Sequence, residues 1–127
     1  MNLLLDTCTF IWLCAEPKKL SAKAKSHLRD AVELGISDVS VMEISLKWQA
    51  GKIRLPQPPS YWIEEQSEMH QLRRWPLTRD VICRASELAA FHKDPFDRLL
   101  VAQAQTFKLT IVTPDQYIKA YPVSYIW

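Results

Sequence analysis

The feature that most constrains the fold of this chain is a repeated alternation of short apolar runs with longer amphipathic segments. Residues 2–5 are apolar on both faces, as in a strand buried inside a sheet, and residues 7–14 have the pattern of a helix. Strands that alternate with helices in this way are typical of parallel sheets. We therefore expect an α/β fold, a three-layer α/β/α domain with a central, mostly parallel sheet.

Capping residues and prolines place the remaining elements. Ser40 and Glu43 have the spacing of a capping box, and Asp94-Pro95 combines a capping acid with proline at the first helical position. Thr113-Pro114 repeats that combination. The predicted helices span residues 7–14, 21–34, 40–50, 61–69, 80–91, 95–107 and 113–120, and the predicted strands span residues 2–5, 36–37, 72–77, 109–112 and 123–126.

Length and composition indicate one folded domain. The chain has 127 residues, of which 48% are hydrophobic and 24% charged, so it can bury a core without disulfides, and intrinsic disorder is excluded. No repeat or long linker divides it, and we expect residues 1–127 to form a single domain. The formal net charge of +2 does not by itself indicate a nucleic-acid partner.

The cysteines and the first apolar run bear on the cellular compartment. The three cysteines form no CxxC pair and have no neighbouring histidines, which argues against a disulfide framework and against a zinc site. Asp6 interrupts the first apolar run, which is too short for a secretion signal, and no segment has the length of a membrane span. We expect a cytoplasmic protein with reduced thiols and no membrane association.

Several acids fall where an open parallel sheet binds ligands, just beyond the carboxyl ends of its strands. Asp6, Glu43 and Asp115 lie at or after predicted strand ends, and Asp97 lies in the first turn of the helix that Asp94 caps. Each acid also has a structural interpretation, because capping and the helix dipole favour acids at helix starts. That interpretation is weakest for Asp6.

The joint placement of these acids favours a metal site over separate structural roles. Crowded carboxylates repel one another by about 1–4 kcal/mol per close pair, so they need a cation. An all-oxygen ligand set favours Mg²⁺ or Mn²⁺ over zinc, and magnesium often shares oxygens with a substrate phosphate. We infer metal-dependent hydrolysis of a phosphodiester. The chain has no GxGxxG or Walker loop and only two glycines, which argues against nucleotide-driven chemistry.

Four segments carry a resemblance to a known family: residues 3–7 (LLLDT), 39–44 (VSVMEI), 92–104 (HKDPFDRLLVAQA) and 111–115 (IVTPD). Together they resemble the PIN domain family, specifically the VapC-type toxin ribonucleases of type II toxin-antitoxin systems. The resemblance extends to about Tyr121, and DPFDRLLVAQA is its most specific part. It implies a PIN-like nuclease domain that acts as an Mg²⁺- or Mn²⁺-dependent endoribonuclease toxin. It also implies a homodimer that a VapB-type antitoxin protein holds inactive by placing its tail in the active-site groove.

By motif position, the resemblance implies roles for individual acids. Asp6, Glu43 and Asp97 match the catalytic acids that bind the metal, and Asp115 matches a more variable fourth metal ligand. Asp94 occurs in one large branch of the family, and we interpret it as a cap that could also bind metal through water.

The resemblance also implies supporting residues. Thr7, Ser40 and Thr113 would orient the carboxylates through hydrogen bonds. Cys8 departs from the pattern, because histidine or asparagine often occupies that position in the family, and this leaves open the contact that such a residue would make.

The basic residues leave two interpretations open. Clusters at residues 18–29, 47–54 and 73–74 could bind RNA phosphates or could form ordinary solvated surfaces. Among single residues, Arg98, beside Asp97, is the one that we predict to contact a substrate phosphate.

Three alternatives to an endoribonuclease follow from the same sequence. A receiver-like phosphoacceptor domain also gathers acids at strand ends, but it needs paired acids after the first strand and a lysine after a late one, and here Thr7 follows Asp6 and Asp115 follows Thr113-Pro114. A non-catalytic PIN-like binding module would not need the complete set of acids. A nuclease that acts on DNA remains open.

Overall fold

The computed structural model describes residues 1–89 and 93–127, and the strands within them form one five-stranded sheet. The strand order is β3-β2-β1-β4-β5, and every neighbouring pair is parallel. The strands are β1 (Asn2–Leu5), β2 (Glu33–Ser37), β3 (Arg73–Trp75), β4 (Thr110–Val112) and β5 (Tyr125–Ile126). The predicted parallel sheet is therefore confirmed.

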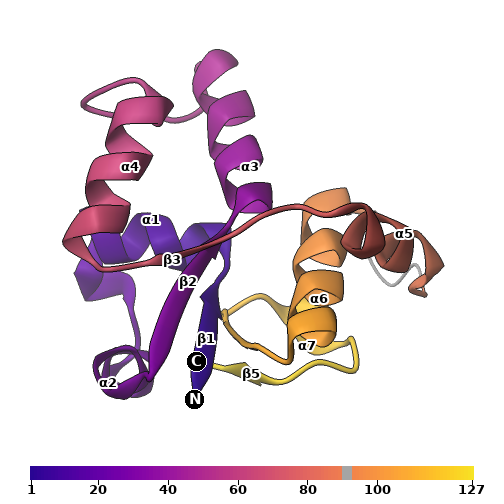
Figure 1. Ribbon diagram of the computed structural model, residues 1–127. Helices are drawn as coiled ribbons and strands as arrows, with labels where there is room; N and C mark the ends of the chain where they lie inside the picture. Colours follow the sequence, from indigo (N-terminus) through magenta and orange to yellow (C-terminus); the bar gives the residue numbers. More distant parts are fainter. Residues whose placement is uncertain (90–92) are drawn as a thin grey trace.

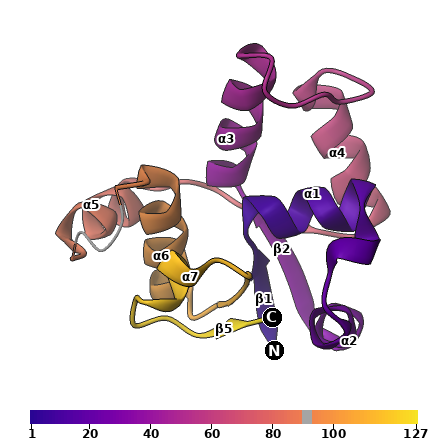
Figure 2. The same ribbon diagram turned by 180° about the vertical axis from the view of Figure 1, so that it is seen from behind.

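Helices cover both faces of this sheet. They are α1 (Thr7–Ala15), α2 (Ala22–Asp30), α3 (Asp38–Gln49), α4 (Pro59–Met69), α5 (Arg79–Glu87), α6 (Pro95–Phe107) and α7 (Gln116–Lys119), with a 3₁₀ turn η1 (Pro17–Lys19). In Figure 1, α1, α2 and α4 lie to the left of the central strands and α5, α6 and α7 to the right; Figure 2 shows the same division from behind. This is the three-layer α/β/α arrangement. Within the described residues, no helix combines the length and the apolar character needed to cross a membrane.

Strand β1 supplies both halves of the core. Leu3 and Leu5 pack in the cluster with residues of α1 to α4, whereas Leu4 packs in the cluster with residues of α6. All three leucines are at most 1% exposed. Because side chains alternate between the two faces of a strand, a run of leucines fits a strand that is covered on both sides. Each buried leucine contributes about 1.5–3 kcal/mol to folding.

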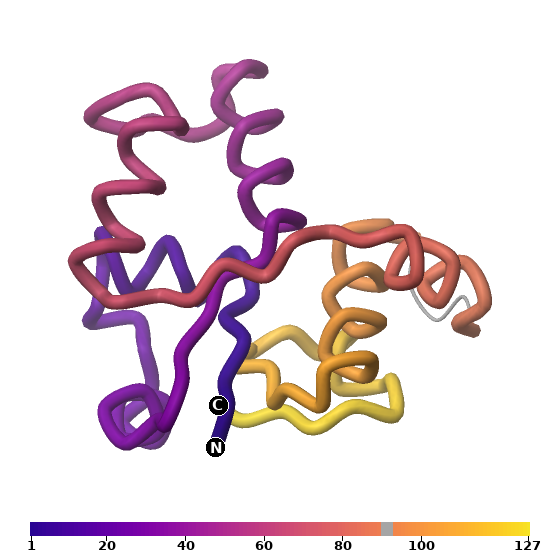
Figure 3. Tube along the Cα trace, in the orientation of Figure 1, coloured from indigo at the N-terminus to yellow at the C-terminus, as the bar shows by residue number. Residues whose placement is uncertain are grey.

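The topology changes direction beside β1. The chain builds β2 and β3 on one side of β1 and then crosses over through α5 and α6 to build β4 on the other side, as the trace in Figure 3 shows. The carboxyl ends of β1 and β4 therefore flank the point at which the strand order reverses. In open α/β sheets, ligands bind at this point.

The second helix and the second strand differ from the prediction. Helix α2 begins after its cap Ser21, as expected, but it ends at Asp30 and not at residue 34. Gly35 does not terminate a helix, because it lies within β2. A Cβ on Gly35 would lie only 2.5 Å from the indole ring of Trp75, so the glycine allows β3 to pack closely beside β2.

The cap of α3 also corrects the prediction. The helix begins at Asp38, and its cap is Ser37, whose hydroxyl accepts a hydrogen bond from the Val39 N–H. The predicted capping box of Ser40 and Glu43 is wrong, because both residues lie inside the helix.

Two further helix boundaries differ from the prediction. Asp115, and not Thr113, caps α7 by accepting a hydrogen bond from the Tyr117 N–H. Helix α5 ends at Glu87, where Leu88 is the C-cap, and the predicted helix end at Phe91 lies outside the described residues. The edge strand β3 and the last strand β5 are shorter than predicted.

Candidate active site

A pocket of about 380 Å³ lies at the carboxyl ends of β1 and β4, and half of the residues that line it are acids. We call it the acid pocket. Its acids come from four separate parts of the chain, namely the start of α1, the middle of α3, the start of α6 and the start of α7. The residues that line it are Asp6, Thr7, Cys8, Ile11, Trp12, Glu43, Lys47, Asp94, Asp97 and Asp115. The structure thus brings together all the acids that the sequence singled out.

Asp6 is the most deeply buried acid of the pocket, with 5% of its surface exposed. It caps α1, because one carboxylate oxygen accepts a hydrogen bond of 2.8 Å from the Thr9 N–H. The other oxygen accepts a bond of 2.5 Å from the Thr113 hydroxyl. Burial raises the pKa of Asp6, and the hydrogen bonds from Thr113 and Thr9 oppose this effect. Asp6 therefore also has a structural role, the capping of α1, which its sequence context indicates less clearly than for the other acids.

Thr113 connects two of the acids. Its side chain is fully buried, and while its hydroxyl donates to Asp6, the same oxygen accepts a hydrogen bond of 3.0 Å from the Asp115 N–H. Its own N–H donates to the carbonyl oxygen of Ile126 in β5. The orientation of the Asp6 carboxylate is thus tied to the position of Asp115, in the manner that the resemblance implies for Thr113.

Asp97 is the acid whose protonation is most perturbed by its neighbours. It lies in the first turn of α6, half-buried, behind the cap Asp94, whose carboxylate accepts a hydrogen bond from the Phe96 N–H. The pKa of Asp97 is raised to about 7, mostly by burial and then, in that order, by the negative charges of Asp94, Asp115, Glu43 and Asp6. Four other carboxylates therefore act on this one group.

Glu43 enters the pocket from the middle of α3. Its carboxylate lies 3.2 Å from the ammonium of Lys47, one helical turn further along. Only 15% of the Glu43 side chain is exposed, compared with 47% of the Lys47 side chain. The motifs do not single out Lys47 as a residue of the site. Its spacing of four residues from Glu43 on one helix is the signal that could have identified it.

Thr7 and Ser40 support the pocket through a bond to each other. The Thr7 hydroxyl donates to the Ser40 hydroxyl over 2.9 Å, and both residues are buried. This bond joins α1 to α3, and it therefore fixes the helix that follows Asp6 relative to the helix that carries Glu43. The two hydroxyls act on the position of helices, whereas the resemblance implied direct contacts with carboxylates.

The donor chemistry of the pocket fits a hard divalent cation. Carboxylates are the charged donors, and their mutual repulsion, visible in the raised pKa of Asp97, is what a cation would relieve. Among the described residues, however, no three acidic, histidine or cysteine side chains are already grouped tightly enough to hold a metal ion. The pocket therefore offers the oxygen donors that a hard divalent cation prefers, without a finished coordination geometry.

Arg98 does not join the acids. It follows Asp97 in α6, yet it is not among the residues that line the acid pocket, and its Nε atom is buried without a hydrogen-bond partner within the described chain. The structure does not bring together Arg98 and the acids.

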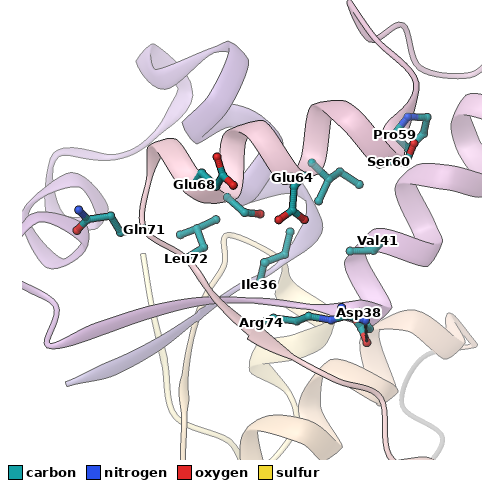
Figure 4. Close-up of a pocket in the computed structure, with 12 residues that line it drawn as sticks. Ile36, Asp38, Val41, Pro59, Ser60, Glu64, Glu68, Gln71, Leu72 and Arg74 are labelled. Carbon is teal, nitrogen blue, oxygen red and sulfur yellow. Dashed lines mark hydrogen bonds and ion pairs between the residues drawn. The ribbon is translucent and has the colours of Figure 1, made fainter.

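A second pocket, of about 470 Å³, lies between α3, α4 and the strands β2 and β3. Figure 4 shows Glu64 and Glu68 on α4, with Asp38 and Arg74 on the opposite side. Asp38 is paired with Arg74 at 3.1 Å. Because none of the predicted site residues lines this pocket, it is separate from the acid pocket.

Comparisons with known proteins bear on the family and the fold of the chain. The family model described as PIN domain matches residues 3–123. A curated relative, Ribonuclease VapC22 of Mycobacterium tuberculosis, is 30% identical over 121 residues, which cover 94% of this chain and 92% of the relative.

Two solved structures resemble the fold of the whole chain. One is VapBC2 from Rickettsia felis bound to a DNA fragment from its promoter, with a TM-score of 0.71 and 15% identity over 100% of this chain and 99% of that one. The other is DNA-bound VapBC from Salmonella typhimurium, with a TM-score of 0.69 and 17% identity over 99% of this chain and 97% of that one.

Proposed function

Because this chain belongs to the PIN domain family, we propose that it is a metal-dependent endoribonuclease, the toxin of a toxin-antitoxin pair. The substrate is RNA, the reaction is hydrolysis of a phosphodiester bond, and the cofactor is Mg²⁺, with Mn²⁺ as a substitute. The observation that carries the proposal is the meeting of Asp6, Glu43, Asp97 and Asp115 in one pocket at the reversal of strand order.

The proposed ligand set divides the work among the acids. Asp6 and Asp97 hold the principal metal ion, and Glu43 and Asp115 complete the site, while Asp94 caps α6 and adds negative charge beside Asp97. When bound, Mg²⁺ supplies positive charge that offsets the carboxylates and the charge that develops on the phosphate during hydrolysis.

The residues of the chain prepare the site for that ion. Thr113 and the Thr9 N–H fix the two oxygens of Asp6, so its carboxylate is oriented before any ligand arrives. Asp97, with a pKa of about 7, exchanges its proton near neutral pH, and a cation favours the ionised form. Metal binding therefore releases a proton from Asp97 at neutral pH.

We further propose a VapB-type antitoxin protein as the partner and a homodimer as the assembly. VapBC structures from two organisms share the fold over nearly the whole chain, and the proposal extends the partnership named in them to this chain. The compartment that we propose is the cytoplasm, where the three free cysteines would remain reduced.

A cleavage assay tests the function. Purified protein with Mg²⁺ should cut single-stranded RNA, should stop when a chelator is added, and should leave DNA intact. Asp6→Asn and Asp97→Asn should lower the rate by at least about 100-fold while preserving the circular dichroism spectrum of the folded chain.

The matched control is Asp38→Asn, which removes an acid that Arg74 already neutralises outside the acid pocket. This variant should cut RNA at nearly the wild-type rate. Full activity of the Asp97→Asn variant would remove the mechanism, and RNA binding without cleavage by the wild type would identify a non-catalytic binding module.

A further inference from the structure

Lys47 is the one basic residue among those that line the acid pocket in the described part of the chain. It lies on α3, one turn beyond Glu43, and its ammonium is 3.2 Å from the Glu43 carboxylate. The other residues that line the pocket are acids, small polar residues and apolar residues. A single positive charge thus faces a group of carboxylates.

The stability that the protein gains from the ion pair between Lys47 and Glu43 is too small to explain why a lysine occupies this position. Exposed pairs four residues apart on a helix contribute little to stability, and nearly half of the Lys47 side chain is exposed to screening solvent. An ammonium also carries three donors, and within the described residues its one ion-pair partner is Glu43. The ammonium of Lys47 therefore has N–H donors available to bind another anion, and its exposed side chain can move towards that anion.

A second lysine, Lys19, lies near one of the residues that line the pocket, Trp12. Lys19 itself does not line the pocket, since it is paired with Glu16 and lies over the ring of Trp12. Of the two lysines, only Lys47 lies where a bound ligand would touch it.

An RNA phosphate that enters this pocket meets carboxylates that repel it, so a positive side chain at the same place gains importance. Arg98, the residue that the sequence suggested for this contact, is not among the lining residues. We propose that Lys47 binds a phosphate of the RNA substrate in the acid pocket, sharing its ammonium between that phosphate and Glu43. This inference rests on the proposed ribonuclease function and adds a substrate-binding residue to it.

Equilibrium binding tests the inference without relying on cleavage. The Asp97→Asn variant, silent in cleavage, would be titrated against a fluorescently labelled single-stranded oligoribonucleotide, and anisotropy would report binding. Adding Lys47→Gln should weaken binding about three- to tenfold. It should also reduce the slope of log affinity against log salt concentration by ~0.7, the value for one phosphate contact on a single strand.

The matched control removes an equal charge elsewhere. Lys108 is exposed at the C-cap of α6, at the opposite end of that helix from Asp97, and it lies outside the basic clusters and the acid pocket. Lys108→Gln in the same background should leave both the affinity and the salt slope unchanged, while Lys47→Arg should retain most of the affinity.

A double-variant cycle separates phosphate binding from an effect through Glu43. If Lys47 only holds Glu43 in place, Lys47→Gln should change nothing once Glu43→Gln is present, and that result would overturn the inference. A loss of affinity and salt slope that persists in the Glu43→Gln background supports the phosphate contact.

The outcomes also separate this inference from the proposed function. If the Asp97→Asn chain binds RNA and Lys47→Gln leaves affinity and slope unchanged, the phosphate contact is wrong and the ribonuclease proposal stands. If the folded Asp97→Asn chain binds no RNA, with Mg²⁺ or with chelator, both the function and the inference fall.

Discussion

The β2–β3 edge of the sheet and the acid pocket differ in how the negative charges of their carboxylates are neutralised. Along the edge formed by β2 and β3, each acid has an arginine: Glu33 lies 2.9 Å from Arg73, and Asp38 lies 3.1 Å from Arg74. In the acid pocket, by contrast, the most buried acid, Asp6, is held by a hydroxyl and a backbone N–H, which carry no charge. Charge is balanced within the protein at the edge but left unbalanced in the pocket.

This difference distinguishes acids whose charge is neutralised by an arginine of the same chain from acids whose charge a bound cation would neutralise. The paired acids at the edge are partly exposed, and such pairs contribute about 0–1 kcal/mol each. In the pocket, the raised pKa of Asp97 means that the ionised form is disfavoured in the folded chain. A fold tolerates that cost where an external cation removes it, and so the unbalanced region is the one to test for function.

The largest expected effect in this comparison comes from the neutral group that holds the acids. Thr113→Val removes the hydroxyl that donates to Asp6 and accepts from the Asp115 N–H, while keeping the side-chain shape. We expect RNA cleavage to fall about 10- to 100-fold, because the carboxylate loses its fixed orientation. Single-turnover cleavage rates at saturating Mg²⁺ measure this effect.

Thr106→Val is the matched control for that variant. The Thr106 hydroxyl donates to the Ala102 carbonyl within α6, outside the acid pocket. Its loss should leave the cleavage rate within about twofold of the wild type, as for an ordinary surface substitution. Equal losses of activity in both variants would mean that the Thr113 hydroxyl has no special connection with the acids.

The sequence predicted the acids of the pocket better than the helix boundaries around them. Asp6 and Asp115 could be placed because apolar strands precede them, and Asp97 because Asp94-Pro95 fixes the start of its helix. Strand ends converge in any parallel sheet, so this part of the site follows from local patterns alone.

The errors share a physical cause, which is that tertiary packing decided between equivalent local signals. Ser37 and Ser40 are both residues that can cap a helix, and α3 begins directly after β2, so Ser37 is the cap. Gly35 has the sequence signature of a helix end, but close packing against Trp75 places it in a strand. Lys47 lies four residues after Glu43, a helical spacing that predicts their ion pair, but the direction in which α3 leaves the sheet decides that this pair lies beside the other acids.

A smaller effect should appear in stability, with opposite signs in the two regions. At pH 7.5 without metal, Asp97→Asn should stabilise the chain by about 1–2 kcal/mol, a figure reduced from the full pKa shift because Asp97 is only half-buried. Asp38→Asn should destabilise it by up to about 1 kcal/mol, because Arg74 loses its partner. Urea unfolding measures the free energy of unfolding of both variants. A change of the same sign in both would contradict the proposed difference between the two regions.

The pH dependence of the same measurement follows from the direction of the shift. The folded chain keeps the Asp97 proton up to about pH 7, whereas an unfolded aspartate releases it near pH 3.8, so the folded state binds more protons between these values. The free energy of unfolding should therefore fall as pH rises from about 4 to about 7. Asp97→Asn should flatten this trend, and Mg²⁺ should raise the melting temperature of the wild type but not of the variant.

The smallest expected effect is on the alkylation rate of Cys8, a cysteine that lines the acid pocket and responds to the charges there. The pKa of Cys8 and that of Cys14 are both raised to about 12, in each case chiefly by burial. At Cys8, Asp6 and Asp115 also raise the pKa, and Lys19 and Lys47 lower it. Since the thiolate is the reactive form, Lys47→Gln should slow the alkylation of Cys8 by iodoacetamide about twofold and leave Cys14 unchanged. Peptide mass spectrometry at pH 8.5 gives the two rates within one sample, so Cys14 is the internal control. Equal rates at Cys8 with and without Lys47 would mean that this ammonium does not act on the pocket, which would weaken the case for its contact with phosphate.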